Sequence, residues 1–575
     1  MIALKWAVGW LGRKRWILIA AILTGISSMV LMAIEPFLFR VIIDDAIVGG
    51  NYDILFPMLL RVLAVAAGYL CLRYVTNILC ETASQCVVVN LRRELFGKIL
   101  HQTALFHREN AVGDLITLCT GDTDMVRHFV CWVIPRSIEC SGMLAGALVI
   151  FMLINIKYAL CLFILTPISA LIAYRLGKTI LPAHTRVREQ RERLSTVVNE
   201  NISGNRVIKA FAREPFEIDK FEKANDAFKD AQVDANYIWL KYQPYMEFIA
   251  GALGVVNLIV GAFLVIRGEI TLGQMNIFFS LAWALNEPML TLGTIINDAQ
   301  RFASSAEKLM SLQYSRVDIE SPASPGAASE RRGKIEIRNA TLRAGGATLL
   351  EDIDFTAMPG QTIGIMGPTG SGKTVLAGLI PRLMDVSEGE VLIDGINVKD
   401  YDLTELRREI GVATQDVFMF SDTVENNVAY GNPEAPLSDV ENAVDTADAA
   451  GFVRKLTQGY DTIVGERGTG LSGGQKQRLS LARALLPKPS ILILDDTVSA
   501  VDMETEKEIQ RKLAELGTHE TRIVIAQRVS LVRNADCIYI LENGRITEKG
   551  THEELLKLGG YYCQTHSLQQ PGEVC

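Results

Sequence analysis

The chain has 575 residues, more than the roughly 100–200 residues of a single domain, so at least two folding units are expected. Hydrophobic residues make up 49% of the chain and charged residues 21%, and these proportions exclude an intrinsically disordered or collagen-like protein. The formal net charge of −8 argues against a protein whose main task is to bind nucleic acid by neutralising phosphates.

Long uncharged stretches in the first half of the chain predict membrane-spanning helices. Most approach the roughly 20 residues that cross a ~30 Å hydrocarbon core. A weaker candidate, Ile54–Cys80, contains Arg61 and Arg73 and is needed to keep the two sides of the membrane alternating. Six spans are therefore predicted. The five uncharged stretches are Trp16–Ile34, Cys140–Ile154, Tyr158–Tyr174, Phe248–Ile266 and Ile270–Asn286.

Basic residues near the ends of these stretches predict their orientation. Residues 13–15, Arg-Lys-Arg, precede the first span and place the N-terminus in the cytoplasm. The polar stretch between the fourth and fifth spans is basic from Arg186 to Arg213 and is expected on the same side. Because an even number of spans returns the chain to the cytoplasm, the sequence predicts a multi-pass protein of the cell membrane with a cytoplasmic C-terminal half.

The segments between the spans predict helices that continue well past the membrane surface. Residues 82–128 and 181–237 keep a helix-like period of polar and apolar residues, and they are expected to reverse at the turn-prone segments 109–114 and 213–217. Residues 315–333, rich in Ser, Pro, Ala and charge, are predicted to be a linker. The chain then divides into an all-α membrane domain, 1–314, and an α/β domain, 334–575.

The α/β domain begins with a phosphate-binding pattern. Residues 367–374 have the form G-x-x-x-x-G-K-T between a strand-like and a helix-like segment, where glycines let backbone N–H groups surround phosphates. Lys373 is expected to neutralise the phosphates, and the Thr374 hydroxyl can ligate Mg²⁺. The apolar strand 491–494 ends in Asp495 and Asp496, where a hard cation would be held. The residues expected to bind phosphate are Gly367, Pro368, Thr369, Gly370, Ser371, Gly372, Lys373 and Thr374.

A phosphate loop alone leaves kinases, GTPases and many ATPases open, and a second motif narrows the choice. The signature segment, Leu471-Ser472-Gly473-Gly474-Gln475, lies between the loop and the acidic strand. With it the sequence resembles the ATP-binding-cassette (ABC) transporters over its whole length. Six spans fused ahead of one cassette resemble an exporter half-molecule: a six-helix transmembrane domain with long cytoplasmic extensions, followed by a P-loop ABC ATPase domain.

The resemblance implies further site residues. Gln415 matches the glutamine that reaches Mg²⁺ beside Thr374 and Asp495, residues 462–468 resemble the exporter-specific segment, and 109–114 and 213–217 fall where coupling helices would be. Residues matching the D-loop are Ser499, Ala500, Val501 and Asp502.

The resemblance also implies a dimer. Two cassettes stack head to tail, so Leu471, Ser472, Gly473, Gly474 and Gln475 would complete the ATP site of a second half-transporter.

Two departures from the family pattern predict an impaired ATP site. Asp496 stands where active cassettes carry the catalytic Glu, and displacing a reacting group by about 1 Å can cost on the order of 100-fold in rate. Gln527 stands where the family has its switch His and cannot carry a positive charge. An adenine-stacking aromatic would align near Ala344, although Arg343 could also cover the base. We therefore expect a heterodimer with a non-identical partner; the alternative is a homodimer with Asp496 as a slow catalyst.

The transported substrate is only weakly encoded. Glu139 and Glu287 could line an acidic cavity suited to amphipathic cations, or they could form structural ion pairs. Export of drugs or amphipathic compounds is favoured. The expected partners besides the second half-transporter are the lipid bilayer and a small amphipathic substrate, and not nucleic acid. The alternatives are a homodimeric lipid or peptide exporter, siderophore import, and an ATP-gated channel or regulatory subunit. A soluble DNA-repair or ribosome-acting ATPase disagrees with the six spans.

Overall fold

The computed structural model describes residues 2–324, 326, 332–465, 468, 470–497, 501–515 and 520–570. The chain forms two compact units, one containing Met1–Ile99 with Gly113–Ser315 and the other Leu100–Val112 with Arg316–Cys575. The short helix α4 (Ala104–Glu109) therefore belongs to the second unit, although it lies in sequence between helices of the first.

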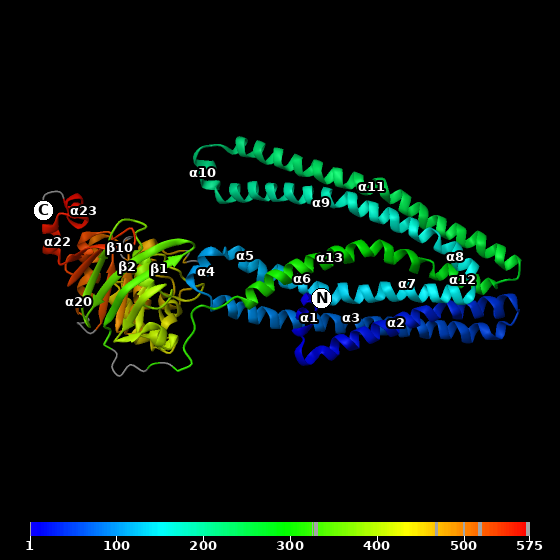
Figure 1. The fold of residues 1–575 in the computed structure, drawn as a ribbon, viewed down its shortest axis with the longest axis horizontal. Coiled ribbons are helices and arrows are strands. Elements are labelled where there is room, and N and C mark those ends of the chain that lie inside the picture. Colours follow the sequence, from blue (N-terminus) through cyan, green and yellow to red (C-terminus); the bar gives the residue numbers. More distant parts are fainter. Residues whose placement is uncertain are drawn as a thin grey trace. The chain divides into compact units, whose positions relative to one another are not determined.

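The described residues of the first unit form long helices that run side by side (Figure 1). Its helices are α1 (Ile2–Gly9), α2 (Arg15–Val41), α3 (Leu55–Leu100), α5 (Val112–Thr117), α6 (Thr123–His128), α7 (Ile134–Ile154), α8 (Ile156–Phe163), α9 (Leu165–Ser203), α10 (Asn205–Ala210), α11 (Glu214–Ile266), α12 (Leu272–Leu281) and α13 (Trp283–Tyr314).

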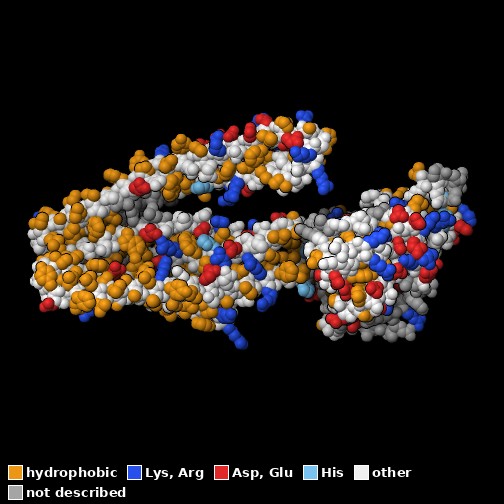
Figure 2. Space-filling model, turned by 180° about the vertical axis from the view of Figure 1, so that it is seen from behind, with side chains coloured by type: hydrophobic (Ala, Val, Ile, Leu, Met, Phe, Trp, Pro, Cys, Tyr) orange, Lys and Arg blue, Asp and Glu red, His pale blue; other side chains and the backbone are white. Residues whose placement is uncertain are grey.

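Among the residues that the structure describes, four helical segments are long and apolar enough to cross a membrane: Gly12–Val48, Tyr52–Leu100, Val112–Ile154 and Glu214–Ile266. A shorter apolar segment covers Leu272–Leu285. The predicted fourth span falls on α8 and the start of α9, where several side chains lie outside the described residues. Figure 2 shows hydrophobic side chains spread over the outer surface of these helices. Such a surface suits contact with the hydrocarbon of a bilayer rather than with water. The chain is a multi-pass membrane protein.

The helices extend far beyond the apolar stretches. Helix α3 has 46 residues and α11 has 53. The chain reverses through α4 and through α10. The predicted reversal segment 109–114 begins at the last residue of α4, and 213–217 covers the turn before α11 and its first residues. The Thr103 hydroxyl accepts a hydrogen bond from the Phe106 N–H and so starts α4 early.

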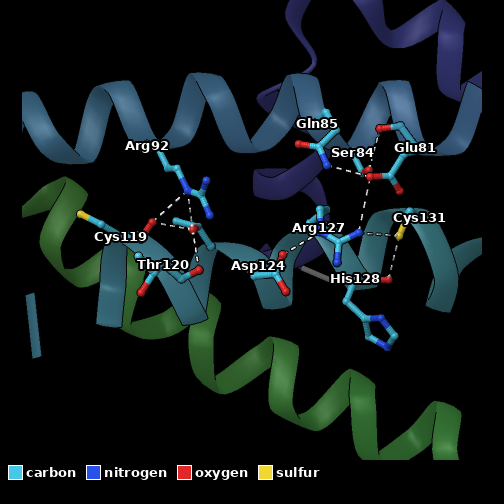
Figure 3. Close-up of polar contacts among 11 residues, drawn as sticks. Glu81, Ser84, Gln85, Arg92, Cys119, Thr120, Asp124, Arg127, His128 and Cys131 are labelled. Atoms are coloured by element: carbon cyan, nitrogen blue, oxygen red, sulfur yellow. Dashed lines mark hydrogen bonds and ion pairs between the residues drawn. The ribbon is translucent and has the colours of Figure 1, made fainter. Parts of the chain in front are cut away.

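Polar contacts join α6 to the helices on either side (Figure 3). Arg92 on α3 donates to the Cys119 carbonyl at 2.9 Å, within the π-helical turn Leu118–Asp122 that precedes α6. Arg127 pairs with Asp124 at 2.7 Å and reaches toward α3. His128 Nε2 lies 3.1 Å from an Asp298 carboxylate oxygen on α13. Charged and polar side chains of these helical extensions therefore hold neighbouring helices together.

The second unit contains two sheets. The antiparallel one has the order β2-β1-β4-β5, and the mainly parallel one has the order β10-β9-β3-β8-β7-β6. The strands are β1 (Ile335–Ala344), β2 (Ala347–Ala357), β3 (Thr362–Met366), β4 (Glu388–Ile393), β5 (Ile396–Asn397), β6 (Ile410–Ala413), β7 (Ile491–Asp495), β8 (Thr521–Ile525), β9 (Cys537–Glu542) and β10 (Arg545–Gly550). Apolar side chains from both sheets form one buried core, as the apolar runs at 362–366, 491–494 and 523–526 predict.

Helices surround the parallel sheet. They are α14 (Lys373–Leu379), α15 (Leu403–Arg408), α16 (Val424–Val428), α17 (Leu437–Thr446), α18 (Ala450–Val453), α19 (Gly473–Leu485), α20 (Met503–Glu515), α21 (Val529–Val532), α22 (His552–Leu558) and α23 (Tyr561–Gln569). A second buried cluster packs α16 to α19 against β6 and β7. The predicted α/β domain following a helical membrane domain is confirmed.

The predicted linker, 315–333, is packed against the second unit in its first part. The Ser321 hydroxyl accepts from the Leu403 N–H at 3.0 Å, and the Glu320 carbonyl accepts from Arg382 at 3.1 Å. Residues 325 and 327–331 lie outside the described residues.

Candidate functional site

The strand order of the parallel sheet brings the predicted site residues to one edge. Strands β3, β8, β7 and β6 are neighbours and run parallel, so their carboxyl ends meet. The segments that follow them carry the phosphate loop, Gln527, Asp495 with Asp496, and Gln415 respectively. This edge is where open α/β sheets bind ligands.

The phosphate loop requires glycine at its first position. Gly367 has φ +147°, and a Cβ added there would lie 2.0 Å from the Leu541 carbonyl oxygen. Gly372, with φ +102°, would place a Cβ 3.1 Å from the Leu349 carbonyl oxygen. Only glycine adopts these conformations so close to another backbone without strain, and the loop is thereby held tightly between β3 and α14.

Two side chains of this loop are suited to bind phosphate. The Lys373 ammonium donates to the Gly367 and Pro368 carbonyls at 2.9 and 2.8 Å, so it is held inside the loop. Burial lowers the pKa of Lys373, and Asp495 and Asp496 oppose that effect. The Ser371 hydroxyl is buried and makes no hydrogen bond with any described residue. A buried hydroxyl without a partner is what a phosphate oxygen would satisfy.

The donor set beside the loop fits Mg²⁺. The Thr374 hydroxyl donates to an Asp495 carboxylate oxygen at 2.8 Å. Burial raises the pKa of Asp495, partly offset by that hydrogen bond, so a bound cation would favour its charged form. Thr374, Asp495 and the Gln415 amide would hold Mg²⁺ through oxygen atoms, and the ion would neutralise phosphate charge.

These residues line one cavity of about 520 Å³. It contains the predicted Thr369, Gly370, Gly372, Lys373 and Thr374, together with Gln415, Asp495, Asp496 and Gln527. Sequence reasoning missed the eight other lining residues: Arg108, Thr348, Leu349, Val375, Ile525, Ala526, Asn543 and Gly544. Asn543-Gly544 is a turn signal that could have been noticed in the sequence. Arg108 is far from the motifs in the sequence, and no local pattern links it to the site.

Both residues that depart from the family pattern face this cavity. Asp496 has the left-handed φ of +49°, and its N–H donates to the Ile525 carbonyl at 3.0 Å. The Gln527 carbonyl accepts from the Gln569 amide at 2.8 Å, which ties the end of β8 to α23. Both backbones are thus fixed, and the length and charge of the side chains determine what they can do there.

The signature segment lies outside this cavity. Ser472 caps α19: its hydroxyl accepts from the Gln475 N–H at 3.3 Å, and the Gln475 side chain accepts from the Ser472 N–H at 2.8 Å. Gly473 and Gly474 form the first turn of that helix. The first N–H groups of α19 therefore lie outside the cavity that contains the chain's own phosphate loop.

Parts of the remaining predicted motifs lie outside the described residues. These are Ser499 and Ala500 of the D-loop and Glu466 and Arg467 of the 462–468 segment. Val501 is buried. The Asp502 carboxylate accepts from the Thr505 N–H at 3.2 Å, and that hydrogen bond lowers its pKa.

In the membrane unit, the predicted acidic residues are paired. Glu139 on α7 lies 2.9 Å from Arg73 on α3 and 3.2 Å from Arg136, which also pairs with Glu287 on α13. Two carboxylates and two guanidinium groups thus form one network that joins three helices. An acidic cavity at Glu139 and Glu287 is not what the structure contains.

An apolar cavity of about 760 Å³ lies near this network. It is enclosed by α2, α7 and residues 281–284, and its lining includes Met29, Met143 and Trp283. The lining hydroxyls of Ser137 and Ser141 donate to carbonyls of their own helix. The cavity therefore offers dispersion contacts and little polar recognition.

Known proteins match the chain over nearly its whole length. The sequence profile described as ABC transporter transmembrane region matches residues 18–289, and the one described as ABC transporter matches 350–499. An uncharacterized ABC transporter ATP-binding protein of Bacillus subtilis, YknU, is 34% identical over 96% of this chain and 94% of its own. An ATP-dependent lipid A-core flippase of Desulfotalea psychrophila is 32% identical over 90% and 91%.

The fold also matches that of a solved structure. A bacterial Atm1-family ABC exporter with ATP bound has a TM-score of 0.81 with this chain at 24% identity, covering 97% of this chain and 99% of the other. The chain therefore shares the fold of that structure, with long helices followed by a sheet-containing ATPase unit.

Proposed function

Because the chain belongs to the ABC transporter family and is a half-transporter of the exporter type, we propose that it works with a non-identical partner and that its own ATP site turns over slowly. Its signature segment would complete the partner's active site. ATP and Mg²⁺ bind at the phosphate loop, and the ATPase domain is cytoplasmic.

The observation that carries this proposal is the position of the two departures. Asp496 and Gln527 line the same cavity as Lys373, so both changes affect one ATP site. Ser472 caps its helix as an intact signature should, and it lies outside that cavity. When two different chains share the catalytic work, one chain is expected to lose the catalytic residues beside its phosphate loop and to retain the signature segment that serves the other chain.

The test uses the chain purified together with its partner from the native membrane. Replacing the partner's catalytic Glu by Gln should reduce steady-state ATPase activity by about 100-fold or more, whereas Asp496→Asn should change it less than twofold. Ser472→Ala in this chain should reduce activity strongly, since it belongs to the active site. Equal losses from the two carboxylate changes would sink the division of labour.

For the substrate, we infer an amphipathic compound whose apolar part enters the cavity of α2 and α7. The paired Glu139 and Glu287 leave no net negative charge to select cations, and the cavity wall is apolar. The flippase names of several relatives favour a lipid among such compounds. The same proposal includes coupling between ATP binding and transport. The segments near 109–114 and 213–217, at α4 and α10, would act as the coupling helices.

Filling the cavity tests the substrate site. Gly146 lines it and has no atom within 4 Å of an added Cβ, so Gly146→Phe projects a ring into the space. Gly251 on α11 is equally open but does not line the cavity, and Gly251→Phe is the matched control. In proteoliposomes, Gly146→Phe should abolish stimulation of the ATPase by amphipathic lipids or drugs. An ATP-gated ionic current without matching hydrolysis would instead identify a channel.

A further inference from the structure

The nucleotide cavity has one wall residue that comes from outside the α/β core. Arg108 lies on α4, which clusters with the second unit, and it lines the cavity together with the phosphate loop. Thr348 and Leu349 at the start of β2 complete that part of the wall. Leu349 is next to the loop, because its carbonyl oxygen would lie 3.1 Å from a Cβ on Gly372.

The same cavity lacks an aromatic surface for the base. None of the described residues that line it is Phe, Tyr, Trp or His. Phe355, the aromatic residue of β1 and β2, is buried in the core with 2% exposure. Arg343, the other residue considered for this role, pairs with Glu388 at 3.0 Å and does not line the cavity. The base of a bound nucleotide therefore needs a different partner.

Arg108 is available for that role. Its side chain is exposed, and it makes no hydrogen bond or ion pair with any described residue. The carboxylates of the cavity, Asp495 and Asp496, belong to the cation end beside Thr374. If the phosphates bind at Lys373, the base would lie against the part of the cavity wall that is formed by Leu349, Thr348 and Arg108. A guanidinium is planar and stacks on aromatic faces, as an ammonium does not.

We propose that Arg108 stacks on the adenine base of ATP bound at Lys373, in place of an aromatic residue at the end of β1. The contact rests on ATP binding by this chain and not on the division of labour proposed above. It also places a nucleotide contact on a helix that is only a few residues from α3 on one side and α5 on the other. ATP bound at this site would therefore contact a helix that is connected within a few residues to two helices of the membrane unit.

The test measures equilibrium binding of Mg–ATP and of Mg–tripolyphosphate to the detergent-purified full chain. Arg108→Ala should weaken ATP binding by about 3- to 10-fold, in line with base stacking by a cation, and leave tripolyphosphate binding unchanged. Arg108→Lys should behave like Arg108→Ala because it keeps the charge and loses the plane. Lys373→Ala is the control that should weaken both ligands.

A rescue separates stacking from a structural effect. In the Arg108→Ala background, Ala344→Tyr supplies a ring from the end of β1 and should restore ATP affinity to within about twofold of the unmodified chain. Equal loss of ATP and tripolyphosphate binding on Arg108→Ala would mean a phosphate contact and overturn the stacking. No loss of ATP binding would overturn the proposal altogether.

Discussion

Asp495 is the buried carboxylate on which the cation end of the nucleotide cavity depends. It accepts a hydrogen bond from Thr374 and stands beside Asp496 and Lys373, and burial raises its pKa above that of an ordinary Asp. A raised pKa means that the charged form is disfavoured in the folded, metal-free chain. Its contribution to the stability of that state is present at low pH and is lost as the pH rises through the raised pKa.

A pH dependence of Mg²⁺-assisted binding follows. As the pH falls through the raised pKa of Asp495, the carboxylate gains a proton and cannot ligate the ion, so the Mg²⁺-dependent part of ATP affinity should disappear at a higher pH than an ordinary Asp would give. Binding of ATP with and without Mg²⁺ across a pH series measures this. Asp495→Asn should show little Mg²⁺-dependent gain at any pH; a gain equal to that of the unmodified chain would contradict the assignment.

Two glycines of the phosphate loop should differ in how they tolerate a methyl group. Gly367→Ala drives a Cβ to 2.0 Å from the Leu541 carbonyl oxygen, so β3 or β9 must move. Gly370 also has a positive φ, but nothing lies within 4 Å of its added Cβ. Without nucleotide, Gly370→Ala should cost about 1 kcal/mol of stability and Gly367→Ala at least about 2–3 kcal/mol more. Thermal unfolding of the two variants checks the difference, and similar midpoints would contradict the close approach.

A helix, strand or loop could be predicted from the sequence when a few adjacent residues specify it. The apolar strand 491–494 and the loop between β3 and α14 were predicted because each is specified by a few adjacent residues. The start of α4 has no such local pattern, because the Thr103 cap is a single hydroxyl. The predicted fourth and sixth spans are each divided between two helices, at Ile164 and Ala282.

Charged residues within apolar helices could be identified but not paired from sequence. Arg136 and Glu139 are three residues apart on α7, a spacing at which a pair can be expected, but nothing local indicates that Arg73 on α3 and Glu287 on α13 join them. The high cost of an isolated charge at this depth predicts only that partners exist. Of the two alternatives that the sequence left open for Glu139 and Glu287, the structure contains the ion pairs and not an acidic cavity.

The network at Glu139 yields a prediction about helix association. Glu139→Gln removes the shared acceptor of Arg73 and Arg136, and the thermal midpoint of the detergent-purified chain should fall. Combining it with Arg73→Gln should cost less than the sum of the two single changes, with a coupling of about 0.5–3 kcal/mol. Glu222→Gln on the exposed face of α11 is the control and should be neutral. Additive losses would mean that the pair contributes nothing to stability.

For the whole molecule, the sequence motifs indicated which residues bind ATP because chemistry fixes their type and spacing. They did not indicate that Arg108 lines the same cavity, since that depends on α4 folding with the second unit. Nor does one chain indicate its partner. Ser472 caps a helix outside the chain's own cavity, so the signature has a catalytic role only when a second cassette is present.

The consequence for assembly can be tested with the chain alone, because its signature segment is intact. Two copies would each contribute Ser472 to the other's site, and only Asp496 and Gln527 would limit turnover. Restoring both, with Asp496→Glu and Gln527→His, should raise ATPase activity of the purified chain by about 10- to 100-fold over a low background. Adding Lys373→Ala should remove the gain. If instead the unmodified chain alone already hydrolyses ATP at a rate that Lys373→Ala abolishes, Asp496 is a working catalyst, and a homodimer explains the protein better than a non-identical pair.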